Sequence, residues 1–112
     1  MKLLYAMTIS LVLAVGAGAV VAQDFQKGYA AAQSGDFVTA LKEWRPLAEQ
    51  GYAQAQYVLG LLYIEGKVVL QDNVRAHMWY NIASVNGAEK AAKLRDETAA
   101  EMTSTDISEA QE

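Results

Sequence analysis

The side chains that could carry out chemistry in this 112-residue sequence are few and widely spaced. It contains one histidine, His77, and no cysteine, which excludes a thiolate nucleophile, a disulfide framework and a cysteine-ligated metal. A general base needs a positioned nucleophile and an orienting group, and the sequence around His77 offers no recognisable setting for either. A single histidine with carboxylates alone also argues against a zinc site. We therefore expect His77 to be a surface or half-buried helical residue, and we expect no catalytic residue, metal or cofactor.

Carboxylates offer a second possible chemistry, because two of them can act as the acid and base of a glycosidase. Glu43, Glu49 and Glu65 are the candidates within helical segments of the repeats described below, and we find no cleft-forming insertion that would desolvate them. We expect them to be solvated charges. Thirteen acidic against nine basic residues give a net charge of −4, which argues against a nucleic-acid partner.

The amino-terminal segment has the pattern of a secretory signal. Lys2 is followed by an uncharged, mostly apolar stretch, 3–22, and small or modest side chains lie one and three residues before Gln23. We predict a signal peptide at 1–22, cleaved after Ala22. The alternative is an uncleaved membrane anchor, because about 20 apolar residues can span a bilayer. In both cases Lys2 stays inside, so the remainder is expected in the periplasm or secreted.

Hydrophobic periodicity in the mature chain is helical throughout, and no stretch alternates as a strand would. Asp36 and Asp72 each precede an apolar-periodic run, where a carboxylate can accept from the open amides of a first helical turn. The breaks carry glycine, at Gly35, Gly51, Gly66 and Gly87. The predicted helices lie at about 24–33, 37–50, 53–65, 73–86 and 88–102, with a possible short sixth after Thr103.

The sequence also matches itself. At an offset of 36 residues, the second member of each pair falls on the first: Asp36 and Asp72, Val38 and Val74, Ala40 and Ala76, Trp44 and Tyr80, Gly51 and Gly87, Ala55 and Ala91. Upstream of the aspartates the offset is 32, which pairs Phe25 with Tyr57 and Gly28 with Gly60. A period in the thirties built of two helices is typical of a helical solenoid, whose hairpins stack to bury a shared core.

The second of these units has a recognisable pattern: Ala55, Leu59-Gly60, Tyr63, Gly66, Val69, Asp72, Ala76, Trp79-Tyr80, Ala83 and Gly87. It resembles one repeat of the Sel-one-like family of tetratricopeptide-like solenoids, and the unit from Gly28 to Trp44 is similar to a shorter tetratricopeptide hairpin. The tail 103–112 is similar to the ends of small exported bacterial members. The resemblance implies an all-α, right-handed solenoid of about two hairpins plus a capping helix over 23–102, followed by a short acidic tail.

The resemblance carries further implications for single residues. The aromatic residues Trp44, Tyr63, Trp79 and Tyr80 match packing positions of the family, so we expect them in the core and not in a sugar-stacking platform. The family has a second glycine in its inter-helix loop where this chain has Val68, and a β-branched residue resists left-handed backbone geometry. That departure puts the geometry of the 66–72 loop in question. The charged last helix is expected to form a polar cap, the alternative being an acidic docking surface.

A candidate partner-binding face follows from the helix at 53–65, which is apolar almost all round. At 100° per residue, one of its faces carries Gln54, Val58, Leu61 and Glu65, an apolar middle between polar ends. First helices of such hairpins line the concave groove in this family, so the face is expected to bind a protein or peptide. The alternative is that Val58 and Leu61 contact the first hairpin or a second copy of the chain.

Two classes of function remain open from the sequence. The resemblance implies a non-enzymatic interaction scaffold in the bacterial cell envelope, with a protein or peptide partner and a possible homodimer. The alternative is a cell-wall-directed enzyme or a carbohydrate-binding accessory protein, which rests on the expected export and the exposed acids. Contact with a membrane is expected only if the amino-terminal segment is retained.

The signal peptide gives the first testable prediction. Intact-mass and amino-terminal peptide measurements on the protein isolated from its own cells should find a chain that begins at Gln23. A chain that still begins at Met1 and resists extraction from membranes would support the anchor instead.

Overall fold

The computed structural model describes residues 24–102, and this part of the chain is all-helical with no strand. A helical segment at 24–33 is followed by four further helices: α2 (Phe37–Glu49), α3 (Ala53–Glu65), α4 (Asn73–Val85) and α5 (Glu89–Ala100). Each end lies within two residues of its predicted position. The predicted signal peptide and the tail 103–112 lie outside the described residues. Within 24–102, no helix is both long and apolar enough to cross a membrane.

The helices begin and end for the reasons that the sequence indicates. Asp36 accepts from the Thr39 N–H at 3.1 Å, and Asp72 accepts from the Arg75 N–H at 3.1 Å, so both aspartates cap first turns as predicted. The four glycines at the breaks all have positive φ, with values of 85°, 96°, 65° and 110° in chain order. A residue that carries a side chain rarely adopts such backbone angles, which explains why each break carries glycine.

The 66–72 loop needs only one left-handed residue. Gly66 ends α3 with φ 65° and ψ 34°, and its N–H donates to the Leu62 carbonyl. Val68 does not have positive φ, since no non-glycine residue within 24–102 does. The Asp72 N–H then donates to the Tyr63 carbonyl at 3.0 Å and brings the chain back to α3 before α4 begins. The valine is therefore compatible with this loop.

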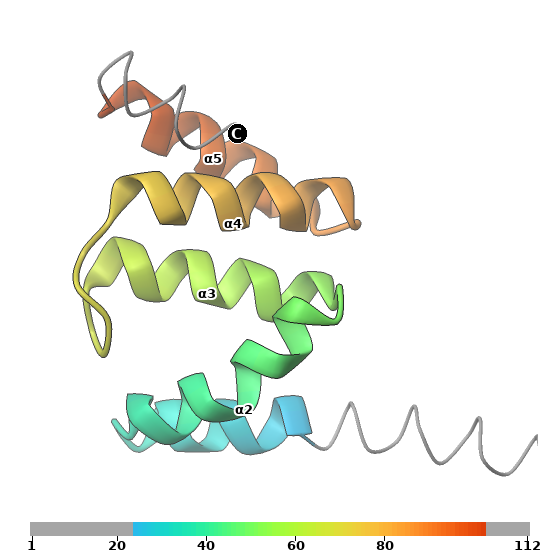
Figure 1. Cartoon of the computed structure of the whole chain (residues 1–112), viewed down its shortest axis with the longest axis vertical. Helices are drawn as coiled ribbons and strands as arrows, with labels where there is room; N and C mark the ends of the chain where they lie inside the picture. Colours follow the sequence, from blue (N-terminus) through green and yellow to red (C-terminus); the bar gives the residue numbers. More distant parts are fainter. Residues whose placement is uncertain (1–23, 103–112) are drawn as a thin grey trace, which may run out of the picture.

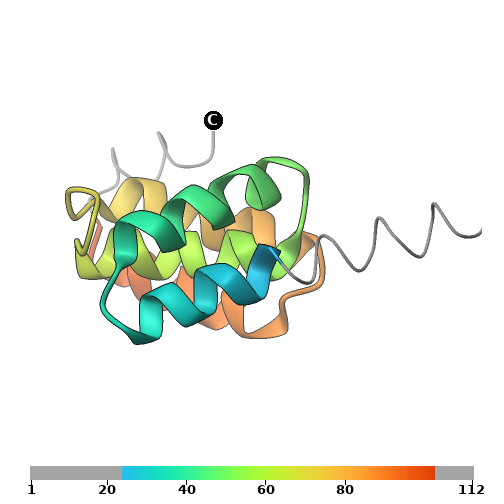
Figure 2. The same cartoon turned by 90° about the horizontal axis from the view of Figure 1, so that it is seen from below.

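The helices pack in chain order. α2 packs against α3, α3 against α4, and α4 against α5, and Figure 1 shows them following one another from the bottom of the view to the top. Seen from below in Figure 2, α2 and α4 lie on one side of the molecule and the 24–33 segment on the other. Short turns make successive helices antiparallel, and α3, which is apolar almost all round, has neighbours on two sides.

The core consists of two adjoining clusters. The first gathers apolar residues of the 24–33 segment, α2 and α3, and the second those of α3, α4 and α5. Half-buried Trp79 packs against both clusters, so it joins them. The residues of the first cluster are Phe25, Ala40, Trp44, Leu47, Ala48, Ala55, Leu59 and Leu62, and those of the second are Tyr63, Ala76, Tyr80, Ala83 and Ala91.

One contact occurs in both clusters. A Cβ added to Gly28 would lie 2.3 Å from the Trp44 ring, and one added to Gly60 would lie 2.4 Å from the Tyr80 ring. Phe25 flanks the first ring, with the two ring centroids 5.7 Å apart, and Tyr57 flanks the second at 6.2 Å. These are the residues that the self-match pairs. The sequence repeat therefore corresponds to a repeated helix–helix contact, in which an aromatic ring lies on bare glycine backbone.

This contact predicts that replacing glycine by alanine destabilises the protein, which is the opposite of the usual effect in a helix. Alanine in place of glycine inside a helix normally stabilises it by about 1 kcal/mol. We expect Gly60→Ala to lower the free energy of unfolding by about 1–3 kcal/mol instead, because the added methyl group overlaps the Tyr80 ring. Urea denaturation followed by circular dichroism measures the change.

The control is a double-mutant cycle with Tyr80→Leu. If the ring is the obstacle, the double variant should be clearly more stable than the sum of the two single losses indicates. Simple additivity would show that Gly60 has some other role.

Candidate functional site

The predicted binding face is the side of α3 that its neighbours cover least. We call Gln54, Val58, Leu61 and Glu65 the α3 stripe. Gln54 and Glu65 are exposed and Val58 and Leu61 are half-buried, whereas the opposite side of the helix is buried. Val58 packs against the first core cluster and Leu61 against the second. The apolar middle of the stripe is thus partly used by the core, and its outer part remains accessible.

The 24–33 segment offers an accessible aromatic residue at the matching position. The offset of 32 residues pairs Tyr29 with Leu61, and the Tyr29 side chain is 49% exposed. On α5 the offset of 36 pairs Leu94 with Val58 and Glu97 with Leu61. Leu94 is half-buried against the second cluster and Glu97 is exposed. The positions that match Leu61 are thus an aromatic residue in the 24–33 segment and an acidic residue on α5.

A pocket of about 650 Å³ adjoins the start of the α3 stripe. Gln54 and Tyr57 of α3 contribute to its wall, and Lys90 contributes from the first turn of α5. Ala53 adds the first residue of α3, and the rest of the lining comes from the two turns that precede these helices: Gly51, Tyr52, Asn86, Gly87 and Ala88. The side chains offered to a ligand are two phenols, two amides and one ammonium group.

Sequence reasoning did not find this pocket, although the signal was present. The pairs Gly51 and Gly87, and Gln54 and Lys90, are related by the offset of 36 residues. In a helical-hairpin solenoid, equivalent turns would lie one above the other, so a space between them would recur with the repeat. The two glycines mark the equivalent turns, and the packing of the helices decides that a pocket lies between them.

A buried glutamine joins the two turns that line the pocket. Gln56 is 3% exposed; its Nε2 donates to the Ala48 carbonyl at 2.9 Å, and its Oε1 accepts from the Asn86 Nδ2 at 2.9 Å. The side chain therefore links the carboxyl ends of α2 and α4 through α3. A polar residue inside a helix is ordinarily exposed, so its burial was not predicted.

The burial of His77 differs from the prediction made from the sequence. It was predicted to be a surface or half-buried residue, but it is 4% exposed, and its Nδ1 has no hydrogen-bond partner among residues 24–102. Burial lowers the pKa of His77, the nearby Arg95 lowers it further, and Asp96 opposes both effects. The prediction was wrong because periodicity within α4 does not show that α5 covers this side of the helix.

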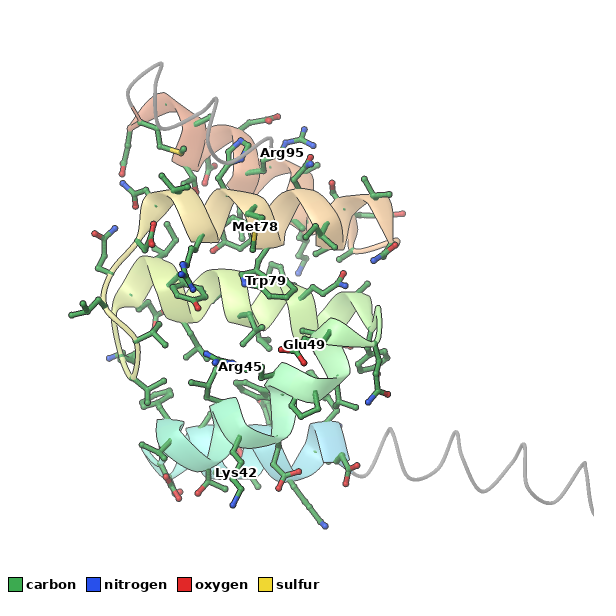
Figure 3. The ribbon with its side chains drawn as sticks, viewed as in Figure 1. Lys42, Arg45, Glu49, Met78, Trp79 and Arg95 are labelled. Atoms are coloured by element: carbon green, nitrogen blue, oxygen red, sulfur yellow. The ribbon has the colours of Figure 1, made fainter. Side chains whose placement is uncertain are left out.

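Arg95 is a second residue that the sequence did not single out. Its Nη1 donates to the Asn81 Oδ1 at 3.0 Å and lies 3.5 Å from the Ser84 Oγ, so it attaches α5 to α4. Figure 3 shows Arg95 on α5, and Met78 and Trp79 on α4. The offset of 36 pairs Arg95 with Leu59, which is a core residue. On α5, the hydrogen bond of Arg95 to α4 therefore stands where α3 has the apolar contacts of Leu59.

The three glutamates considered for catalysis differ in exposure. Glu43 is half-buried, and Glu49 and Glu65 are exposed. Within 24–102, no group of three or more histidine, aspartate or glutamate side chains could hold a metal ion.

The aromatic residues were predicted to pack in the core: Trp44, Tyr63 and Tyr80 are buried, and Trp79 is half-buried between the two clusters. Burial raises the pKa of Tyr80 to about 12, so its phenol stays neutral.

Comparison with known proteins assigns no family. No protein-family model matches the chain, and no curated protein matches it significantly. The resemblance to the Sel-one-like family therefore rests on the residues of the sequence alone.

The buried glutamine gives a prediction about the site. Gln56→Leu removes one partner each from the Ala48 carbonyl and the Asn86 amide and leaves the shape of the helix unchanged. We expect the free energy of unfolding to fall by about 1–3 kcal/mol, because two intramolecular hydrogen bonds are lost and each contributes about 0.5–1.5 kcal/mol. Chemical denaturation measures it.

Gln54→Leu is the matched control on the same helix. That side chain is exposed, so its replacement should change stability by no more than about 0.5 kcal/mol. Equal losses for the two variants would contradict a structural role for the Gln56 hydrogen bonds.

Proposed function

We propose that this chain is a non-enzymatic adaptor of the bacterial cell envelope, which binds a protein or peptide on a short right-handed helical-hairpin solenoid of the Sel-one-like, tetratricopeptide-like kind. The single observation that carries the proposal is the repeated contact of Gly28 with Trp44 and of Gly60 with Tyr80. Hairpins that repeat one packing contact stack in a row and leave one side of their first helices open. Such an open side is the usual binding surface of repeat proteins.

The properties of the α3 stripe support peptide binding. Its half-buried middle, Val58 and Leu61, lies between the exposed polar residues Gln54 and Glu65. An apolar centre with a polar rim is typical of protein–protein contact surfaces. A peptide lying along α3 would place apolar side chains on Leu61 and Tyr29, and backbone or polar groups near Gln54. Because the middle of the stripe is held in place by the core, little ordering is needed on binding.

The composition of the pocket favours binding over cell-wall catalysis. A glycosidase site needs two carboxylates on either side of the scissile bond. None of the residues that line the 650 Å³ pocket is acidic. The location in the envelope rests on the predicted signal peptide, and a homodimer through the same apolar stripe remains part of the proposal.

Site-specific photo-crosslinking tests the proposal directly. A photoreactive phenylalanine analogue at Tyr29 should form crosslinks to a partner in intact cells, and the double variant Gln54→Arg, Glu65→Arg should reduce their yield at least several-fold. Both replaced side chains are exposed, so the fold should be kept. Immunoblotting for shifted bands gives the yield, and circular dichroism checks the fold.

Val38 is the matched control position, because it is 68% exposed and lies on α2. Equal crosslinking from Val38 and Tyr29 would count against the α3 stripe as the binding site. Release of fragments from peptidoglycan by the purified protein, lost on replacing one carboxylate, would overturn the adaptor and support the enzyme.

A further inference from the structure

The contact between α4 and α5 contains an ionisable group that its surroundings keep neutral. His77 is 4% exposed on α4, and within 24–102 its Nδ1 has no hydrogen-bond partner. The charged groups that act on it, Arg95 and Asp96, both belong to α5. Arg95 is also the residue that attaches α5 to α4 through Asn81. The imidazole and the attachment point thus share one interface.

Other charged groups near α4 do not compensate a charge on His77. Glu65 of α3 and Glu97 of α5 act on Tyr80, and Asp72, which caps α4, acts on Arg75. Asp96 is the one opposing charge, but its side chain is 70% exposed and already accepts from the Arg95 Nε at 3.0 Å. An imidazolium at position 77 would therefore be a buried cation beside a guanidinium, which is costly.

The helix that covers His77 is held by few buried side chains. α5 buries two residues, Ala91 and Thr98, whereas α3 buries six. Most of its remaining side chains are charged or small. Segments with few buried apolar contacts open at a lower free energy than the whole domain. Strain at this interface would therefore be relieved by movement of α5 before the other helices unfold.

We propose that the α4–α5 contact is a pH-sensitive switch, in which protonation of His77 in mild acid releases α5 while the helices up to α4 stay folded. Release would also alter the 650 Å³ pocket, because Ala88 and Lys90 form part of its wall. The switch is a property of the fold and does not depend on the identity of any partner.

The direction of the effect follows from proton linkage. Burial lowers the pKa of His77 in the closed state. When α5 is released the imidazole returns to its ordinary pKa of about 6.5, so the open state binds the proton more tightly. The closed state is therefore fully favoured above that pH and loses stability as the pH falls below it. The opening equilibrium rises by up to about tenfold per pH unit until the closed state also binds the proton.

Amide hydrogen exchange of the natural chain, measured by mass spectrometry at pH 7.5 and pH 5.5, tests the switch. After correction for intrinsic exchange rates, protection of α5 should fall by up to about tenfold at pH 5.5. Protection of α3 should change by less than twofold. Carboxylates remain largely ionised at pH 5.5, because their ordinary pKa values are about 4.

Two variants make the result decisive. His77→Leu copies the first hairpin, where the offset of 36 places Leu41, and His77→Gln keeps a neutral polar group. Both should abolish the pH dependence of α5 exchange. The proposal is overturned if α5 protection in the natural chain does not change with pH, if α3 and α5 lose protection together, or if a folded variant keeps the same dependence.

Discussion

Close packing of an aromatic ring on glycine backbone is the contact on which this structure depends. In each hairpin one helix supplies the glycine and the next supplies the ring: Gly28 with Trp44, and Gly60 with Tyr80. The absence of a side chain lets the helices approach, and the ring then covers the exposed backbone. The Trp44 indole also donates to the Phe25 carbonyl at 3.0 Å, so the larger ring is fixed by a hydrogen bond as well. The core clusters form around these two contacts.

The same repeated contact explains how α3 can serve as a surface and as part of the core. Its inner residues belong to both clusters, since Leu59 and Leu62 lie in the first and Tyr63 in the second. Because α2 and α4 cover two sides of α3, its third side is the least covered, and this side carries the α3 stripe. Surface side chains that the core holds in place need little further ordering when a ligand binds, which is why the stripe suits the proposed peptide site.

The last helix differs from the others in how it is attached. Arg95 occupies the position of the core residue Leu59 and contacts Asn81 and Ser84 of α4. A polar helix at the end of a stack protects the final apolar face without offering a new one. It also leaves that end with few apolar contacts, and this is where the buried His77 lies. Few buried residues hold this end of the stack, and the proposed switch depends on that feature.

The sequence alone determined the local structure. Helix bounds, the caps at Asp36 and Asp72 and the glycines at the breaks depend on residues close in the chain, so periodicity and end signals were sufficient. The self-match also identified the residues that form the repeated contact, and of the candidate site it gave the least covered side of α3. Burial of His77 and Gln56, and the pocket between the two turns, were decided by the tertiary structure. Each arises from contact between helices distant in sequence, and neither a residue's type nor its spacing within one helix shows which neighbour will cover it.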